Sequence, residues 1–320
     1  MRQNDPSSLL AAARAGERRA LARLLSLVEQ GGAPAREVGR LAYPLGGAAY
    51  TVGITGAPGA GKSTLTSALI GELRVEGLEV AVLAIDPSSP FSGGAILGDR
   101  VRMGDHALDD GVFIRSMATR GHLGGLALAA PEAVRVLDAV GRKWVLLETV
   151  GVGQVEVEVA EATDTTVVVV NPGWGDAVQA NKAGLMEIAD VFVINKADRP
   201  GVNDTRRDLE QMLDLAPHRA DGVDWRPPIV ATVASDAKGV DELWRTIGAH
   251  RAHLEATGRL AGKRADRLDR ELRQIIAERL QERADQLCAS PEFERRAAQV
   301  LARAIDPWTA ADEVLRAVGA

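Results

Sequence analysis

Between residues 51 and 250 the chain alternates short apolar runs with longer stretches in which apolar residues recur at helical spacing. The runs are rich in β-branched residues and contain few polar interruptions. In chain order they are TVGIT, EVAVLAID, GVFIRS, KWVLLET, TTVVVVN, VFVIN and PPIVATV. Nearly continuous apolar strands that alternate with helices are typical of a parallel sheet covered on both faces. The pattern therefore predicts an α/β fold with a central, mostly parallel sheet and helices on both faces.

The first 45 residues show helical spacing and no strand pattern. Apolar residues recur three or four positions apart over residues 8–30, and Gly16 interrupts the series. This spacing predicts either one kinked helix or two short helices. The segment GGAPA, at residues 31–35, is expected to separate them from the next part of the chain. We therefore expect an N-terminal helical extension over residues 1–45.

After about residue 250 the strand pattern stops. The segment KRADRLDRELRQIIAERLQERADQL predicts one long charged helix. Ser290 followed by Pro291 is typical of an N-cap and a first helical position. Thr309, with Asp312 three residues later, is expected to open a last helix over TAADEVLRAVG.

Helices that carry this many charges need a surface to pack against, and the sequence leaves two alternatives open. They fold back onto their own domain, or they form a dimerisation arm. In either case we predict three parts for the chain. These are the N-terminal extension over residues 1–45, a central domain over 46–257 and a C-terminal helical segment over 258–320.

Composition narrows the class of protein. The chain has 320 residues, with 38 Lys and Arg against 44 Asp and Glu, and a net charge of −6 argues against a general nucleic-acid binder. A single cysteine, Cys288, excludes a disulfide framework and fits a reducing compartment. No apolar run is as long as a membrane span, and the first residues lack the order of a signal peptide. We expect a cytoplasmic protein.

A glycine-rich stretch, GAPGAGKST, follows the first apolar run and matches the phosphate-loop pattern G-x-x-x-x-G-K-[ST]. Its glycines let backbone N–H groups turn toward phosphate oxygens, and the helix after it adds its positive N-terminal end. Lys62 is expected to reach the β- and γ-phosphates, and Ser63 to supply a hydroxyl to Mg²⁺. The expected nucleotide-binding residues are Gly56, Ala57, Pro58, Gly59, Ala60, Gly61, Lys62, Ser63 and Thr64.

The tetrad NKAD follows the run VFVIN, in the position of the guanine-reading element of GTPases. The Asp198 carboxylate can accept from the N1–H and the exocyclic amine of guanine, a pair of donors that adenine lacks. Asn195 is expected to meet the base edge and to tie back to the phosphate loop, while the Lys196 stem lies along the base. The next apolar run ends where main-chain N–H groups back the base in such folds, and it ends with Val233, Ala234 and Ser235.

The stretch ETVGVGQ ends another apolar run with a carboxylate and places a glycine three residues later. In a nucleotide-binding domain Glu148 fits the carboxylate that binds Mg²⁺ through water or positions the attacking water. The Gly151 N–H can sense the γ-phosphate. Val152 stands where such loops carry the glutamine that orients water, so intrinsic hydrolysis is expected to be slow.

Two further glycine-rich stretches carry polar side chains. IDPSSPFSGGAILGDRVRM contains Asp86 at a strand end and Asp99 in the loop, both candidate neighbours of Mg²⁺. NPGWGDAVQANKAGLMEIAD carries Trp174 in a loop, where it packs in the core or contacts a partner. In the same stretch Gln179 and Lys182 are positioned to point back at the nucleotide. The candidate magnesium ligands are Ser63, Asp86, Asp99 and Glu148.

Together with the closing DPWTAADEVL, these stretches resemble the methylmalonyl-CoA mutase-associated GTPases of the MeaB/ArgK/MMAA group over essentially the whole chain. The resemblance implies a P-loop NTPase of the SIMIBI class that binds GTP, GDP and Mg²⁺ and holds no tightly bound cobalamin. It implies a homodimer that chaperones an adenosylcobalamin-dependent acyl-CoA mutase, of the methylmalonyl-CoA or isobutyryl-CoA type, by gating cofactor delivery and protecting the mutase. It also implies a third nucleotide-responsive segment at residues 171–184.

Three alternatives stay open. A nickel-inserting GTPase of hydrogenase or urease maturation would need metal-ligand clusters, and the five histidines form no Cys/His cluster in sequence. His250 and His253 have helical spacing, which favours a solvated helix face over a metal pair. A kinase of a transport system shares the phosphate loop but conflicts with NKAD. The last alternative is a scaffold that holds GTP without hydrolysing it.

Overall fold

The computed structural model describes residues 5–87, 104–106, 108–119, 125–149, 155–173, 187–215 and 225–318. Within it the chain forms two compact units, Met1–Arg267 and Leu268–Ala320.

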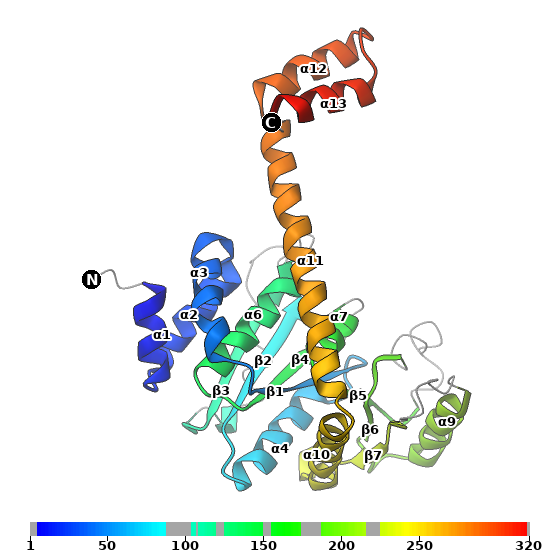
Figure 1. The fold of residues 1–320 in the computed structure, drawn as a ribbon. Helices are drawn as coiled ribbons and strands as arrows, with labels where there is room; N and C mark the ends of the chain where they lie inside the picture. The colour runs from blue at the N-terminus through cyan, green and yellow to red at the C-terminus, as the bar shows by residue number, and fades with distance from the viewer. Residues whose placement is uncertain are drawn as a thin grey trace. The chain divides into compact units, whose positions relative to one another are not determined.

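The first unit is built on a seven-stranded sheet with the strand order β3-β2-β4-β1-β5-β6-β7 (Figure 1). Its strands are β1 (Tyr50–Gly56), β2 (Val80–Pro87), β3 (Val112–Thr119), β4 (Trp144–Thr149), β5 (Thr165–Val170), β6 (Val191–Asn195) and β7 (Ile229–Thr232). Every pairing between these strands is parallel, which confirms the predicted sheet and all seven apolar runs. Because the strands are parallel, the segments after their carboxyl ends meet at one edge of the sheet.

Helices cover both faces of the sheet. One face packs against α4 (Lys62–Val75) and α10 (Val240–Ala256), with buried apolar side chains from the strands between them. The other face is covered by α6 (Gly125–Ala139) and α7 (Val155–Ala162) near β2 and β4, and by α9 (Val202–Leu215) near β5 and β6. Successive residues of a strand point to opposite faces, so strands this apolar supply both layers of the core.

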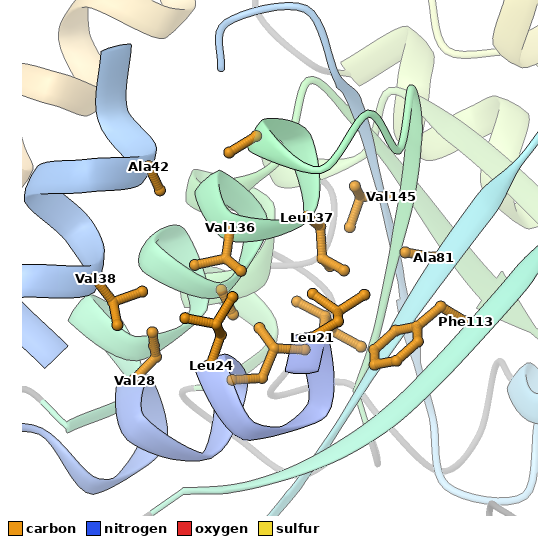
Figure 2. Packing of buried hydrophobic residues seen from close by; sticks show 14 of the residues in the cluster. Leu21, Leu24, Val28, Val38, Ala42, Ala81, Phe113, Val136, Leu137 and Val145 are labelled. Carbon is orange, nitrogen blue, oxygen red and sulfur yellow. The ribbon is translucent and has the colours of Figure 1, made fainter. Parts of the chain in front are cut away.

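The N-terminal extension packs on the outer side of α6. It consists of α1 (Pro6–Arg14), α2 (Arg18–Gln30), α3 (Gly32–Ala42) and the short 3-10 turn η1 (Tyr43–Leu45). Figure 2 shows Leu21 and Leu24 of α2 beside Val136 and Leu137 of α6, in a cluster that reaches Phe113 of β3. This extension therefore shares a hydrophobic core with the sheet.

The structure settles the choice left open for residues 8–30 and corrects the interpretation of GGAPA. Two helices form, because Gly16 adopts a φ of +97° between them. GGAPA is not a separator: Gly31 ends α2 with a φ of +73°, and α3 begins at the next residue. Pro34 fits the first turn of a helix, where its missing N–H leaves no intrahelical bond unmade.

The second unit contains most of α11 (Arg259–Cys288), together with α12 (Pro291–Leu301) and α13 (Pro307–Val318). The cap at Ser290 is confirmed, since its Oγ accepts from Phe293 N at 3.3 Å. The prediction that Thr309 caps the last helix is wrong. Asp306 accepts from the N–H groups of Trp308 and Thr309 at 2.9 and 3.0 Å, so the helix starts earlier.

Within this unit α12 and α13 form a helical hairpin. Ala310 and Val314 of α13 are buried, and an ion pair of 2.6 Å joins Arg296 to Glu313. Among the helices of the described residues, none combines the length and the apolar character that a membrane span requires.

His250 of α10 does not lie on a solvated helix face, as its spacing favoured, because α10 turns this side chain toward the sheet. Its exposed fraction is 1%, and its Nδ1 lies 2.8 Å from Thr165 Oγ1, which in turn lies 2.6 Å from the Tyr50 hydroxyl. The ring of Trp225 lies against it in a tilted arrangement, at a centroid distance of 4.8 Å. Burial lowers the pKa of His250 to about 4, although the nearby Asp190 carboxylate acts in the opposite direction.

We predict that this histidine makes the fold sensitive to mild acid. Its pKa is lower in the folded than in the unfolded chain, so the unfolded state binds the extra proton as pH falls below 6.5. Stability should therefore be about 2 kcal/mol lower at pH 5 than at pH 7, measured by urea unfolding. His250→Gln should remove most of this difference. His106→Gln, on the turn at Gly104–His106, is the matched control and should keep it. An unchanged pH dependence in His250→Gln would contradict the prediction.

Candidate nucleotide site

The phosphate loop joins β1 to α4, and two of its glycines are fixed by close contacts. Gly56 has a φ of +130°, and a Cβ at this position would lie 2.0 Å from Val169 O of β5. Gly61 caps α4 with a φ of +90°, and its Cβ would lie 2.4 Å from Asn195 Nδ2. Both positions therefore require glycine for conformation and for space. The glycine pattern in the sequence reflects packing against β5 and β6 as well as access for phosphate.

Lys62, the first residue of α4, lies folded over this loop. Its Nζ donates to Gly56 O at 2.8 Å and to Ala57 O at 3.0 Å, and its exposed fraction is only 6%. The N-terminal end of a helix carries a partial positive charge and unpaired N–H groups. The ammonium and the helix end together form a site for an anion such as a phosphate group.

Ser63 and Glu148 meet beside this loop. Ser63 Oγ donates to Glu148 Oε1 at 2.6 Å, and both side chains are buried. Glu148 comes from the carboxyl end of β4, where it pairs in register with Ile54 of β1. The next residue, Thr149, donates from its hydroxyl to Thr55 Oγ1 at 3.0 Å, which holds the two strand ends together. A hydroxyl and a carboxylate are hard oxygen donors, so this pair fits Mg²⁺.

Asp86 lies at the same edge of the sheet. It belongs to β2, two residues beyond Ala84, which pairs with Glu148. Its backbone therefore reaches the carboxyl edge of the sheet near β4. The side chain of Asp86 and the whole of Asp99 lie outside the described residues.

The NKAD tetrad is tied to the phosphate loop by Asn195. The amide Nδ2 donates to Ala60 O at 2.8 Å, and Oδ1 accepts from Thr232 Oγ1 at 3.1 Å and from Ala234 N at 3.2 Å. Lys196 adopts a φ of +59°, and its Nζ donates to Gly59 O at 2.6 Å. One amide thus joins three chain segments: the phosphate loop, the end of β6 and the end of β7.

The other residues expected to contact the base follow β6 and β7. Asp198 is exposed just beyond β6. Val233 forms an isolated antiparallel bridge with Lys238, which closes the loop after β7. Ala234 is buried within this loop, while Ser235 is exposed and bonds to Asp236.

Sequence reasoning did not identify two polar residues at strand ends. Thr232, the last residue of β7, orients Asn195, and Asn171, directly after β5, donates to Gly59 O at 3.5 Å. The available signal was the same in both cases: a polar residue at the carboxyl end of an otherwise apolar run. Gly151, Val152, Trp174, Gln179 and Lys182 lie outside the described residues.

A phosphate-loop pattern at the end of β1 and an NKAD tetrad at the end of β6, on a parallel sheet covered by helices on both faces, are the features of the P-loop GTPase class. The sequence matches the model of one family, described as "Methylmalonyl Co-A mutase-associated GTPase MeaB", over residues 21–289. The chain belongs to this family, which confirms the resemblance that its motifs carry.

Relatives in three organisms agree with this assignment. A protein of Pyrococcus abyssi named as a GTPase is 54% identical over 95% of this chain and 94% of its own length. "GTPase ArgK" of Escherichia coli is 40% identical over 90% of this chain and 88% of its own. "Methylmalonic aciduria type A homolog, mitochondrial" of Mus musculus is 36% identical over 84% and 65%. Among solved structures, one titled "LAO/AO transport system kinase" has a TM-score of 0.73 at 30% identity and covers 100% of this chain and 99% of that one.

We predict that Gly61→Ala destabilises the nucleotide-free protein and weakens nucleotide binding. The added Cβ would lie 2.4 Å from Asn195 Nδ2 at a φ of +90°, and the strained backbone alone costs about 1–2 kcal/mol. Gly71→Ala, inside α4, is the matched control, because its Cβ meets nothing within 4 Å. That change should stabilise the helix by roughly 0.5–1 kcal/mol. Urea unfolding of both variants tests the contrast, and equal stabilities would show that the Asn195 contact does not constrain the loop.

Proposed function

We propose that this chain is a GTP-hydrolysing chaperone of an adenosylcobalamin-dependent acyl-CoA mutase, gating delivery of the cofactor and protecting the mutase. The observation that carries the proposal is the junction at Asn195, which joins a phosphate loop to a guanine-reading tetrad, in a chain whose family is described as mutase-associated. The name of the mouse relative, which refers to methylmalonic aciduria, points to the same metabolism. The partner would be a mutase of the methylmalonyl-CoA or isobutyryl-CoA type.

In this proposal the phosphates bind over the N-terminal end of α4. Lys62 moves its ammonium from loop carbonyls to the β- and γ-phosphate oxygens, which are stronger acceptors because they are charged. Ser63 and Glu148 hold Mg²⁺, with Asp86 and Asp99 as further candidates at the same edge. The ion would neutralise charge that develops on the phosphates during hydrolysis.

The base would bind on the other side of Asn195. Asp198 accepts from the two donors of guanine that adenine lacks, and the Lys196 stem covers one face of the base. The loop at Val233, Ala234 and Ser235 supplies main-chain N–H groups. Asn195 supports this role because its bonds to Ala60 and Ala234 fix the distance between the phosphate and base sides.

Hydrolysis would be slow in the isolated protein. Val152 cannot orient water, so Glu148 and the Gly151 N–H would act without the usual glutamine. We assign the missing contribution to Gln179 and Lys182, within the segment at residues 171–184, once a mutase has bound. The cobalamin would stay with the mutase, since the proposed role of this chain is to control its delivery.

A cognate mutase should raise GTP turnover strongly. A stabilising group added at the transition state of such a site is worth about 10³–10⁵ in rate. Lys182→Ala should lose most of the increase and keep its affinity for GDP, whereas Lys62→Ala should lose turnover both with and without mutase. Steady-state phosphate release with methylmalonyl-CoA and isobutyryl-CoA mutases measures this. Equal stimulation of wild type and Lys182→Ala would refute the role of Lys182. No stimulation by either mutase would refute the chaperone function.

The alternatives have less support. Among the residues that the structure describes, no group of three or more His, Cys, Asp or Glu side chains could hold a metal ion, and His250 is used inside the core. A nickel-inserting role therefore rests on no observation. The NKAD tetrad, proposed to read guanine, disfavours a kinase of a transport system. The measurement of GTP turnover distinguishes a GTPase from a scaffold that holds GTP without hydrolysing it.

We also propose that α11 pairs with a second copy of the chain. Four large apolar side chains repeat every fourth residue along it and are 43–64% exposed: Leu268, Leu272, Ile276 and Leu280. The face they form lies on a helix of 30 residues whose composition is otherwise mostly polar. An apolar stripe on a long charged helix is the pattern of helices that pair with each other.

Leu272→Glu combined with Ile276→Glu should convert the dimer to a monomer at micromolar concentration, because two charges would be buried against an apolar partner. The matched control places the same two charges off the stripe, as Ala277→Glu with Gln281→Glu at two exposed neutral positions, and should remain dimeric. Sedimentation velocity distinguishes the two species. A monomeric wild type would overturn this proposal and leave the GTPase assignment unaffected.

A further inference from the structure

The first turns of α11, residues 259–267, are held to the sheet by an ionic cluster remote in sequence from the nucleotide motifs. We call these residues the arm root. Arg264 Nη2 lies 2.8 Å from Asp164 Oδ2, and Arg267 Nη2 lies 3.2 Å from Asp164 Oδ1. Arg264 also donates to Ala49 O at 2.7 Å. Both arginines belong to the same compact unit as the sheet, so the cluster is internal to that unit.

Asp164 is the centre of this cluster and is nearly inaccessible, with a side-chain exposure of 1%. Its carboxylate also accepts from the N–H of Thr51, the second residue of β1, at 3.0 Å. Burial acts to raise the pKa of Asp164, but the guanidinium groups of Arg264 and Arg267 outweigh it and hold the pKa below its usual value. Asp164 is therefore a buried charge that depends on the arm root, and the arm root is correspondingly fixed to it.

Lys263 connects Asp164 to a second aspartate, Asp190. Its Nζ donates to Asp164 O at 2.8 Å and to Asp190 Oδ2 at 3.2 Å. Asp190 in turn accepts from Thr166 N at 2.9 Å and contacts His250 at 3.5 Å. One ammonium group on the arm root thus bridges the segment before β5 and the segment before β6.

Asp164 and Asp190, the two residues that Lys263 contacts, each follow a segment that is expected to respond to the nucleotide. Residues 150–154, the stretch expected to sense the γ-phosphate, lead directly into α7, and α7 leads into Asp164. Residues 171–184, the other segment expected to respond to nucleotide, lead through a few residues to Asp190. Each aspartate is therefore the point where the chain leaving a nucleotide-responsive segment re-enters the sheet, and Lys263 contacts both points.

We propose that Lys263 couples the nucleotide state to the arm root. A shift of α7 along its axis would move Asp164 O relative to Asp190 Oδ2, which is held by the N–H of Thr166. The ammonium cannot keep both contacts, at 2.8 and 3.2 Å, through such a shift, so the arm root would take a second arrangement after it. The nucleotide would select between these arrangements, so a change at the phosphates would reach the arm root. This inference rests on the proposed function, because it requires GTP and GDP to produce different loop conformations.

Hydrogen exchange measured by mass spectrometry on the full chain tests the coupling. In wild type, the amides of residues 259–267 should exchange at rates that differ by about fivefold or more between GDP and a non-hydrolysable GTP analogue. In Lys263→Met the difference should disappear, with basal GTP hydrolysis unchanged. Arg273→Met is the matched control, since it removes an exposed cation from the same helix and its pair with Asp269. It should keep the wild-type difference.

The possible failures are distinguishable. If residues 148–154 and 171–184 respond to the nucleotide but residues 259–267 do not, the coupling is refuted and the proposed GTPase switch stands. If Lys263→Met keeps the full difference, Lys263 is a structural contact only and the inference is wrong. If no segment responds to the nucleotide, the proposed switch fails, and the coupling fails with it.

Discussion

The hydrogen bonds of the Asn195 amide are the interactions on which the candidate nucleotide site depends. The two ends of the amide group bond to the phosphate loop and to the loop after β7, so a single planar group fixes the spacing between segments more than 130 residues apart in the chain. The fit is close enough that a methyl group at Gly61 would collide with it. The parallel sheet supplies the frame for this contact by bringing the ends of β1, β6 and β7 to one edge. The ionic cluster at the opposite ends of β5 and β6 uses the same frame for another purpose.

Much of the fold could be predicted from the sequence because the strands are buried on both faces and read as continuous apolar runs. The errors occurred where the signal was local and weak. GGAPA resembles a break, yet proline and small residues also fit the first turn of α3. Thr309 has the pattern of a cap because it precedes an acidic residue, but Asp306 offers a carboxylate, which is a stronger acceptor. His250 has the spacing of a surface residue, and only the packing of α10 shows that it is buried.

The candidate site also has a part that the sequence predicts and a part that it does not. The phosphate-loop pattern and the NKAD tetrad are each one short continuous stretch, so both could be recognised from residue spacing alone. The NKAD motif predicts the tie of Asn195 to the phosphate loop, which the structure confirms, but the other contacts between distant segments could not be read from spacing. Thr232 gave no motif, although its hydroxyl orients Asn195. The bonds of Lys263 to Asp164 and Asp190 join residues 99 and 73 positions apart, and the charged pattern of α11 does not specify which of its cations will be internal.

The strand order also bears on how the chain is completed during synthesis. β1 lies between β4 and β5, and its residues Tyr50 and Val52 pair with Trp144 and Thr165. The first strand to be made thus has no sheet neighbour until roughly a hundred further residues have left the ribosome, which takes about 5–20 s at the usual rates of elongation. Gly56 and Gly61 of the phosphate loop pack against Val169 and Asn195. The loop therefore cannot reach its final conformation before these two residues have been made. During this interval an apolar strand is without its partners, and the nascent chain is exposed to aggregation.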